Sequence, residues 1–268
     1  SGLQGSAAAL LLAGLPEYGT TTLFIANDPE EAGYLYNDFM QIRNDNRVLF
    51  FPSGYKRALK YGQTDPAADI LRTDTINRLQ QADESLIVVT YPEALCEKVA
   101  SNEELHRNTL RLAKGEKCDL ASVADFLTGY GFERVDYVYE PGQFAVRGSI
   151  VDVYSFSSDL PYRIDTFGDE IESIRAFNID TQLSQNPVNE IFIIPDLQAG
   201  STSGISLLQF IDKNTLLAVK DLAWVLERMH SVATDTISQQ LLLTEEGDLH
   251  AKEKLIDTDD FSRYVLDF

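Results

Sequence analysis

The first hundred residues alternate between short apolar runs and longer amphipathic stretches. Buried strands are expected at TTTLFIAND, RVLFFPS and SLIVVT, since each is rich in β-branched or aromatic residues and bounded by polar residues. A helix is expected from Pro29, which is followed by two glutamates that suit a first helical turn, and another over residues 65–82. YPEALCEKV begins a third helix. This order predicts an α/β layer with a mostly parallel sheet.

The pattern changes after about residue 112. LASVADFLTGYGF is typical of one amphipathic helix that ends at a glycine. QFAVRGSIVDVY has interrupted alternation, which predicts a strand bent at Gly148. YRIDTF and IESIRAF alternate more regularly on either side of the Gly168-Asp169 turn, and NEIFIIPD is a further strand. The first three of these strands, QFAVRGSIVDVY, YRIDTF and IESIRAF, fall within about forty residues, so we expect them to form an antiparallel meander.

The last part of the chain returns to the first pattern. DLQAGSTSGI is a linker of small residues, and NTLLAVKDLAWVLERMHSV predicts a strand followed by a helix, with Trp224 in the core. SRYVLDF is interpreted as a final strand. The simplest organisation is an α/β domain in two pieces, 1–112 and 199–268, with an α+β domain inserted at 113–198.

Charge and cysteine content narrow the function classes. The chain has 22 Lys and Arg against 42 Asp and Glu, a net charge of −20, which argues against autonomous binding to nucleic acid. Cys96 and Cys118 are too few and too far apart for a disulfide scaffold or a zinc site, and predict reduced thiols in a cytoplasmic protein. No apolar run approaches the roughly 18 residues of a membrane span, and no basic region precedes LLLAGL as in a signal peptide.

The opening residues GLQGSAAA have the spacing of a P-loop. Gly2, Gly5 and Ser6 stand where such a loop has them, but the three positions that should read Gly-Lys-Thr are Ala7, Ala8 and Ala9. Alanine supplies neither the charge for the phosphates nor the hydroxyl for Mg²⁺, so a degenerate P-loop of this kind could not organise MgATP. The alternative is an ordinary glycine-containing loop before an alanine-rich helix.

Two arginines and one aromatic residue form a candidate partner-binding patch. Arg147 directly precedes Gly148, Arg163 lies in the next expected strand, and Phe167 follows four residues later on the same strand face. Arginine and aromatic side chains are frequent anchors of protein interfaces.

A plainer interpretation of the same residues stays open. The two arginines could form surface ion pairs with Asp152, Asp165 or Glu172, and Phe167 could belong to the core.

A group of carboxylates near the Gly168 turn offers a catalytic alternative. Asp165, Asp169, Glu170 and Glu172 could bind a metal or form an acid and base pair, as in a hydrolase. No nucleophile or histidine accompanies them, which favours a solvated loop with no metal and no catalytic residue.

Several of these segments together resemble a known family. GLQGSAAA, FFPSGYKR, IVVTYPEAL, YEPGQFAVRGSIVDVYSF, PYRIDTFGDEIESIRAFN and DTQLS are similar to the amino-terminal region of the bacterial transcription-repair coupling factor (Mfd) family, which is itself similar to the excision-repair helicase UvrB. The resemblance runs from residue 1 to about 195, and more weakly over 214–268. FAVRGSIVDVYSFSSDLPYRIDTFGDEIESIR is its most specific part.

The resemblance implies both a fold and a function. The fold is a split, degenerate helicase-like α/β domain without ATPase activity, with an inserted domain that binds the damage-recognition ATPase UvrA. Arg147, Arg163 and Phe167 match the family positions that contact UvrA, and Asp165 and Glu170 are expected to orient the arginines. The implied function is a non-catalytic, cofactor-free adaptor that recruits UvrA to stalled transcription; the alternative is a nucleotide- or metal-dependent hydrolase domain of a DNA-repair protein.

The resemblance also limits what this chain should bind. The family's RNA polymerase-binding and translocase regions correspond to nothing in these 268 residues, so polymerase and DNA are expected partners of regions beyond Phe268. The stretch FPSGYKRALKYGQTDPAADIL is short where UvrB has a long DNA-clamping hairpin. A monomer without membrane contact is expected.

Overall fold

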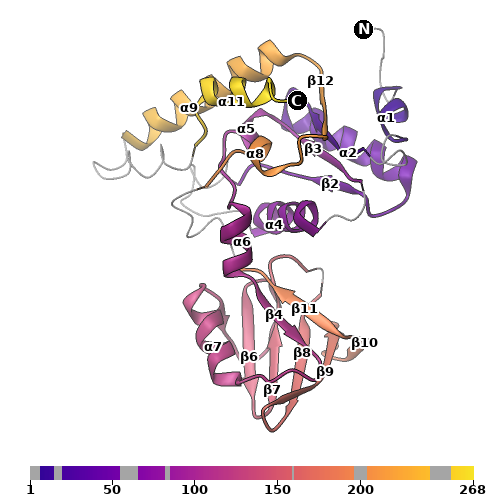
Figure 1. Ribbon diagram of the computed structural model, residues 1–268, viewed down its shortest axis with the longest axis vertical. Helices are drawn as coiled ribbons and strands as arrows, with labels where there is room; N and C mark the ends of the chain where they lie inside the picture. Colours follow the sequence, from indigo (N-terminus) through magenta and orange to yellow (C-terminus); the bar gives the residue numbers. More distant parts are fainter. Residues whose placement is uncertain are drawn as a thin grey trace. The chain divides into compact units, whose positions relative to one another are not determined.

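The chain forms two compact units in a computed structural model that describes residues 7–14, 20–54, 66–81, 85–158, 160–195, 204–241 and 255–268 (Figure 1). Residues 1–102 and 201–268 make the first unit, and residues 103–200 make the second. The junctions therefore lie at 102/103 and 200/201, whereas the sequence pattern predicts them at 112/113 and 198/199. Part of the difference at the first junction arises because β4 (Leu110–Ala113) pairs with β11 (Glu190–Ile193), which places residues 110–112 in the second unit.

The first unit is built on a parallel sheet of four strands in the order β12-β1-β3-β2. Strands β1 (Thr22–Ile25) and β3 (Ile87–Thr90) are buried at every residue, as expected of central strands covered on both faces. The edge strands are β2 (Val48–Phe50) and β12 (Leu216–Val219), both parallel to their neighbours. Because β12 follows the second unit in sequence, the returning chain completes the sheet, and the parallel α/β prediction is confirmed.

Helices connect and cover these strands. They are α1 (Ala7–Leu12), α2 (Pro29–Arg43), α4 (Pro66–Gln81), α5 (Pro92–Leu95), α8 (Leu207–Phe210), α9 (Leu222–Leu241) and α11 (Thr258–Val265). No helix within the described ranges is long and apolar enough to cross a membrane.

Two predictions for the end of the first unit are wrong. The first four residues of SRYVLDF end helix α11, which Asp257 caps through its side chain and which buries Phe261, and the last three follow the helix without forming a strand. Trp224 is not a core residue: it is 48% exposed and donates its indole N–H to the carbonyl of Asn27 at 3.3 Å. A tryptophan that keeps its N–H near the surface in this way satisfies its one polar group without burial.

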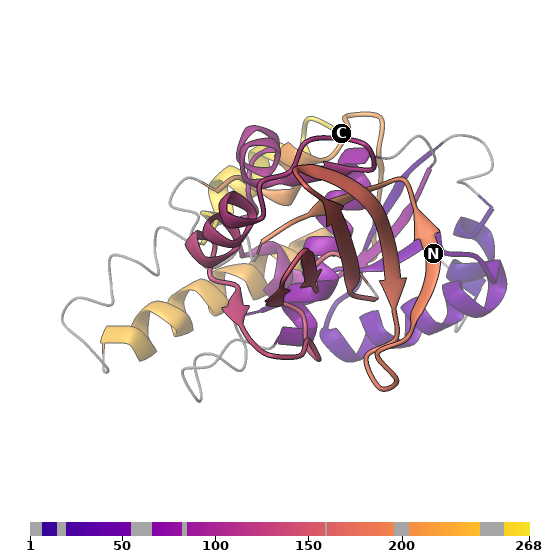
Figure 2. The ribbon, with the colours of Figure 1, turned by 90° about the horizontal axis from the view of Figure 1, so that it is seen from below.

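The second unit contains a six-stranded sheet in the order β10-β9-β8-β7-β6-β5. All neighbours pair antiparallel except β5 and β6, and Figure 2 shows the pronounced curve of the strands. The strands are β5 (Glu133–Arg134), β6 (Gln143–Arg147), β7 (Ile150–Val153), β8 (Tyr162–Phe167), β9 (Glu170–Phe177) and β10 (Ser184–Val188). Helices α6 (Asn102–Asn108) and α7 (Leu120–Gly129) and the β4–β11 pair complete it.

The segment QFAVRGSIVDVY is two strands and not one bent strand. Arg147 at the end of β6 pairs with Ile150 at the start of β7, so Gly148 and Ser149 form a two-residue hairpin loop. Gly148 has φ of +62°, a conformation that glycine adopts without steric cost. The glycine therefore reverses the chain, and the antiparallel meander has five strands, β6 to β10, instead of three.

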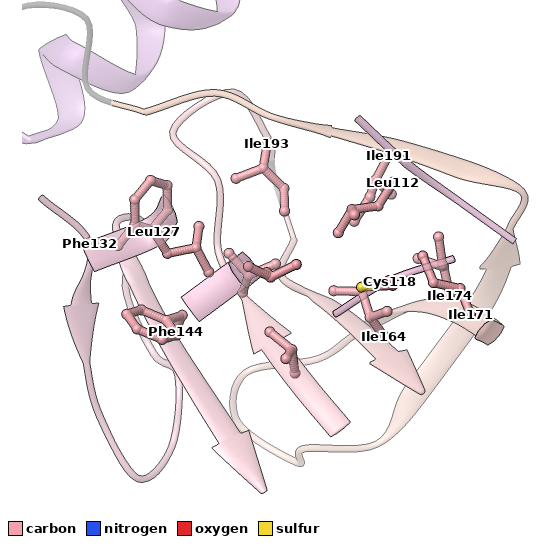
Figure 3. Packing of buried hydrophobic residues seen from close by; sticks show 13 residues of the cluster. Leu112, Cys118, Leu127, Phe132, Phe144, Ile164, Ile171, Ile174, Ile191 and Ile193 are labelled. Carbon is pink, nitrogen blue, oxygen red and sulfur yellow. The ribbon is translucent and has the colours of Figure 1, made fainter. Parts of the chain in front are cut away.

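The main core of the second unit lies on one face of the six-stranded sheet. Side chains from the strands meet helix α7, the residues just beyond its end and the β4–β11 pair, and Figure 3 shows them pointing toward one another. The cluster consists of Leu112, Cys118, Val123, Leu127, Phe132, Phe144, Val151, Val153, Ile164, Ile171, Ile174, Ile191 and Ile193. A smaller cluster, Val138, Ala145, Tyr154 and Phe177, lies apart from it.

Candidate functional site

A row of charged side chains crosses the face of the six-stranded sheet that points away from the main core. Asp152 on β7 lies directly opposite Arg163 on β8, and Arg163 lies directly opposite Arg175 on β9. Residues directly opposite one another in an antiparallel ladder share a face. Because their neighbours Val151, Val153 and Ile164 face the core, the charged residues must face the other way.

Asp152 binds two arginines on this face. Its side chain is fully buried, and its two oxygens accept hydrogen bonds from Arg163, Nε to Oδ1 at 2.7 Å and Nη2 to Oδ2 at 2.8 Å. Arg147 donates from Nη2 to the same Oδ2. Strand β7 separates β6, which carries Arg147, from β8, which carries Arg163, so the expectation that the arginines lie on adjacent strands is wrong. Asp152, on the strand between them, joins the two.

Arg163 is the more buried of the two arginines. The side chain of Arg163 is 17% exposed, donates from Nη1 to the carbonyl of Gln182 at 3.2 Å, and lies 4.7 Å from the centroid of the Phe177 ring. The hydrogen bond to Asp152 raises the pKa of Arg163 above its ordinary value, with burial acting in the opposite direction.

Arg147 reaches further into solvent, with 36% of its side chain exposed. It donates from Nη1 to the carbonyl of Asp136 at 2.7 Å, and its guanidinium lies 5.2 Å from the centroid of the Tyr137 ring. Tyr137 is itself among the exposed large side chains, so cation and ring together form part of the surface.

Phe167 is the most exposed aromatic side chain of the described second unit, at 81%. It ends strand β8, in which Ile164 and Thr166 are buried, so the alternation places Phe167 on the same face as Arg163, as predicted. The pairing does shift here, since Asp165 opposes Ser173 but Thr166 opposes Ile171. The extra residue therefore lies on β9 and leaves the alternation of β8 intact, and the alternative that Phe167 is a core residue is wrong.

The residues expected to orient the arginines do not do so. Asp165 pairs with Arg175 and accepts a hydrogen bond from the Ser173 hydroxyl at 3.2 Å. Neither Asp165 nor Glu170 hydrogen-bonds to Arg147 or Arg163 within the described ranges. Both arginines pair with Asp152 instead, which confirms that part of the plainer interpretation. Arg175 is a residue of this face that the sequence reasoning missed, although its place in the alternation of IESIRAF was the signal.

The other candidate sites of the sequence are only partly visible. Gly2, Gly5 and Ser6 lie outside the described residues, and Ala7, Ala8 and Ala9 form the first turn of α1. The four carboxylates near Gly168 do not converge: Asp165 pairs with Arg175, and Asp169 pairs with Lys117 at 3.3 Å. No group of three or more metal-ligating side chains occurs in the part of the chain that the structure describes.

Comparison with known proteins finds a family that matches most of the second unit and relatives that match most of the chain. Residues 110–198 match the family described as the UvrB interaction domain. The chain is 31% identical over 196 residues to a transcription-repair-coupling factor of Escherichia coli K12, covering 72% of this chain and 17% of that protein. It is 29% identical over 209 residues to the corresponding protein of Bacillus subtilis 168, covering 74% of this chain and 18% of that protein. A Rickettsia bellii relative is 31% identical over 175 residues, covering 65% and 15% respectively.

The second unit, with its charged sheet face and exposed phenylalanine, is therefore a UvrB interaction domain. Over 72–74% of its length the chain is similar to these transcription-repair-coupling factors, which confirms the resemblance drawn from its motifs. It spans less than a fifth of the length of these relatives.

Proposed function

We propose that this chain is a non-catalytic adaptor region that binds UvrA and thereby recruits nucleotide excision repair to stalled RNA polymerase. The observation that carries the proposal is the exposed surface of Arg147 and Phe167, on one face of the sheet in a UvrB interaction domain. We call the set Arg147, Arg163 and Phe167 the UvrA patch.

The chemistry of the UvrA patch suits a protein partner. Phe167 exposes most of its ring, and burial of a side chain of this size contributes about 1.5–3 kcal/mol to association. Arg147 offers a charged, planar donor that can bind a partner carboxylate bidentately. The expected site on UvrA is thus an apolar pocket bordered by an acidic side chain.

For the first unit we infer a helicase-like domain that does not hydrolyse ATP. Its parallel sheet with flanking helices supports a helicase-like origin, and the run AAALLL in α1 provides no side chain for phosphate or Mg²⁺. RNA polymerase and DNA would then be bound by parts of the longer relatives that this chain does not span.

Binding of purified UvrA to single variants tests the proposal. Arg147→Ala is expected to weaken binding by at least roughly thirtyfold, because truncating an arginine from a desolvated interfacial pair typically costs about 2–5 kcal/mol. Phe167→Ala is expected to weaken binding without lowering stability, since the ring makes little contact within the unit. Arg163→Ala should weaken binding too, but should also lower the free energy of unfolding, because Asp152 loses its bidentate partner.

Arg111→Ala is the matched control. Arg111 is an exposed arginine of the same unit, on β4, and it pairs with Glu116 and Glu190. The variant should bind UvrA like the wild type. Wild-type affinity of both Arg147→Ala and Phe167→Ala, with circular dichroism unchanged, would show that UvrA binds elsewhere or not at all.

A further inference from the structure

We infer that Asp152 is a positioning residue of the UvrA patch. Its carboxylate holds Arg147 in the conformation that binds UvrA, and Arg163 in turn holds the carboxylate from the buried side. The inference deepens the proposed function and rests on it. It assigns different roles to the two arginines, one that contacts the partner and one that acts through a buried carboxylate.

The burial of Asp152 requires such an arrangement. A fully buried carboxylate is strongly unfavourable unless it is paired and hydrogen-bonded, and Asp152 accepts from both guanidinium groups. Two cations around one anion leave a net positive charge. That charge appears at the surface on Arg147, because Arg163 is the more buried of the two.

The hydrogen bonds show how much of each arginine is left for a partner. An arginine has five N–H donors. Arg163 uses three of its nitrogens, two on Asp152 and one on the carbonyl of Gln182, while its flat face covers Phe177. Arg147 uses two nitrogens, Nη2 on Asp152 and Nη1 on the carbonyl of Asp136, and more of its side chain reaches solvent. Arg147 is therefore the arginine suited to contact UvrA.

Positioning matters because an arginine has many rotamers. A side chain that is already fixed loses little freedom on binding, so a preorganised Arg147 binds more tightly than a mobile one. Asp152 and the Asp136 carbonyl fix two nitrogens of the guanidinium, which sets the direction of the whole group. Without Asp152, Arg147 would keep its charge but lose this orientation.

The same sheet face provides a matched control pair. Asp165 pairs with Arg175 one strand along, but Asp165 is partly exposed and hydrogen-bonds to a single arginine. Asp165→Asn removes the same charge from the same face and leaves the Asp152 contacts in place. It is expected to change UvrA affinity less than twofold.

The experiment is a double-mutant cycle with UvrA titrations. Asp152→Asn keeps the shape of the side chain and removes its charge, and should weaken UvrA binding about tenfold, which corresponds to roughly 1.4 kcal/mol. In an Arg147→Ala background the same substitution should change affinity less than twofold, since the residue it positions is gone. In a Phe167→Ala background it should again weaken binding about tenfold. A purely structural role for Asp152 would give the same loss in every background.

A measurement on the wild-type chain remains informative if Asp152→Asn does not fold. Nuclear magnetic resonance of the arginine side chains should show separate, slowly exchanging N–H signals for Arg147 and Arg163, because both are held by a buried carboxylate. Averaged, rapidly exchanging signals for Arg147 would overturn the inference.

Three binding outcomes would also overturn it. They are wild-type affinity of folded Asp152→Asn, equal losses with and without Arg147, and an equal loss for Asp165→Asn. Each of these leaves the proposed function standing if Arg147→Ala still weakens binding. If Arg147→Ala binds UvrA like the wild type, the proposed function itself fails, and the inference fails with it.

Discussion

Gly142 shows how single positions constrain the second unit. It has φ of +83°, and a Cβ atom placed on it would lie 2.5 Å from Cζ of Phe156. Both the backbone conformation and the space disfavour a side chain, since the Phe156 ring would have to shift. Gly148, by contrast, has φ of +62°, but a Cβ atom added there would meet nothing within 4 Å, so only its conformation favours glycine.

Replacing each of these two glycines by alanine should lower the stability by different amounts. Gly142→Ala is expected to lower the free energy of unfolding of the second unit by about 2–4 kcal/mol, since overpacking adds to the conformational cost. Gly148→Ala should cost only about 1–2 kcal/mol. Urea denaturation of both variants measures the difference, and equal losses would mean that Phe156 moves aside freely.

The three alanines at Ala7, Ala8 and Ala9 predict that the chain does not bind ATP. ATP with Mg²⁺ is expected to produce no shift of the melting temperature, because alanines stand where a P-loop has its lysine and hydroxyl. A ligand present at about 100 times its Kd would stabilise the chain by about 2.7 kcal/mol, which a thermal melt detects readily. A saturable shift would contradict the degenerate P-loop.

The candidate site is only partly predictable at the level of residues. Strand periodicity places Arg163 and Phe167 on one face correctly, because a period of two needs no knowledge of the neighbouring strands. The role of Asp152 depends on the register of β7 between β6 and β8. Local sequence does not determine which acidic side chain reaches the two arginines, and so Asp152, Asp165, Glu170 and Glu172 are all plausible partners from sequence.

Among the elements, helix α2 shows strong local signals that agree. Asp28 precedes Pro29 and accepts a hydrogen bond from the backbone N–H of Glu31 at 2.8 Å, and Asn44 ends the helix in a left-handed conformation. Because these signals lie within the segment itself, the sequence locates this helix correctly.

Removal of the cap tests its contribution. Asp28→Ala is expected to lower the stability of the first unit by about 1 kcal/mol, because an N–H of the first turn loses its acceptor. Asp28→Ser keeps a capping oxygen and should cost much less. Chemical denaturation of the two variants should separate them, and equal stabilities would mean that water replaces the cap.

Helix α11 and the β6–β7 hairpin show where element prediction fails. SRYVLDF taken alone has the apolar content of a strand, whereas the capping Asp257 and the acidic first turn of Asp259 and Asp260 lie upstream of it. A glycine within an alternating run is compatible with a bend or a turn, and only the pairing of Arg147 with Ile150 distinguishes them.

At the scale of the whole molecule, charge dominates the expected behaviour toward nucleic acid. With a net charge of −20, the chain should bind duplex DNA with a Kd on the order of 10⁻⁴ M or weaker at physiological salt, as expected of non-specific contacts at best. A gel-shift titration measures this. Submicromolar binding would require a basic surface that outweighs the overall charge.

The division into two units follows from the change of pattern along the chain, but the strand order of the first sheet does not. Strand β12 pairs with β1 although the whole second unit separates them in sequence. No local signal encodes a partner at that distance, so the sequence predicts the class of the sheet and not its order.

The pairing of β4 with β11 also has a consequence for modularity. Leu110 pairs with Ile193, so the two ends of the UvrB interaction domain lie side by side at the start of one antiparallel ladder. A domain whose two ends lie this close together can be inserted into a surface loop of another protein, because the two ends of that loop need to be only about two strands apart. Residues 103–200 should therefore fold when they are inserted into another scaffold, with the UvrA patch unchanged on the six-stranded sheet.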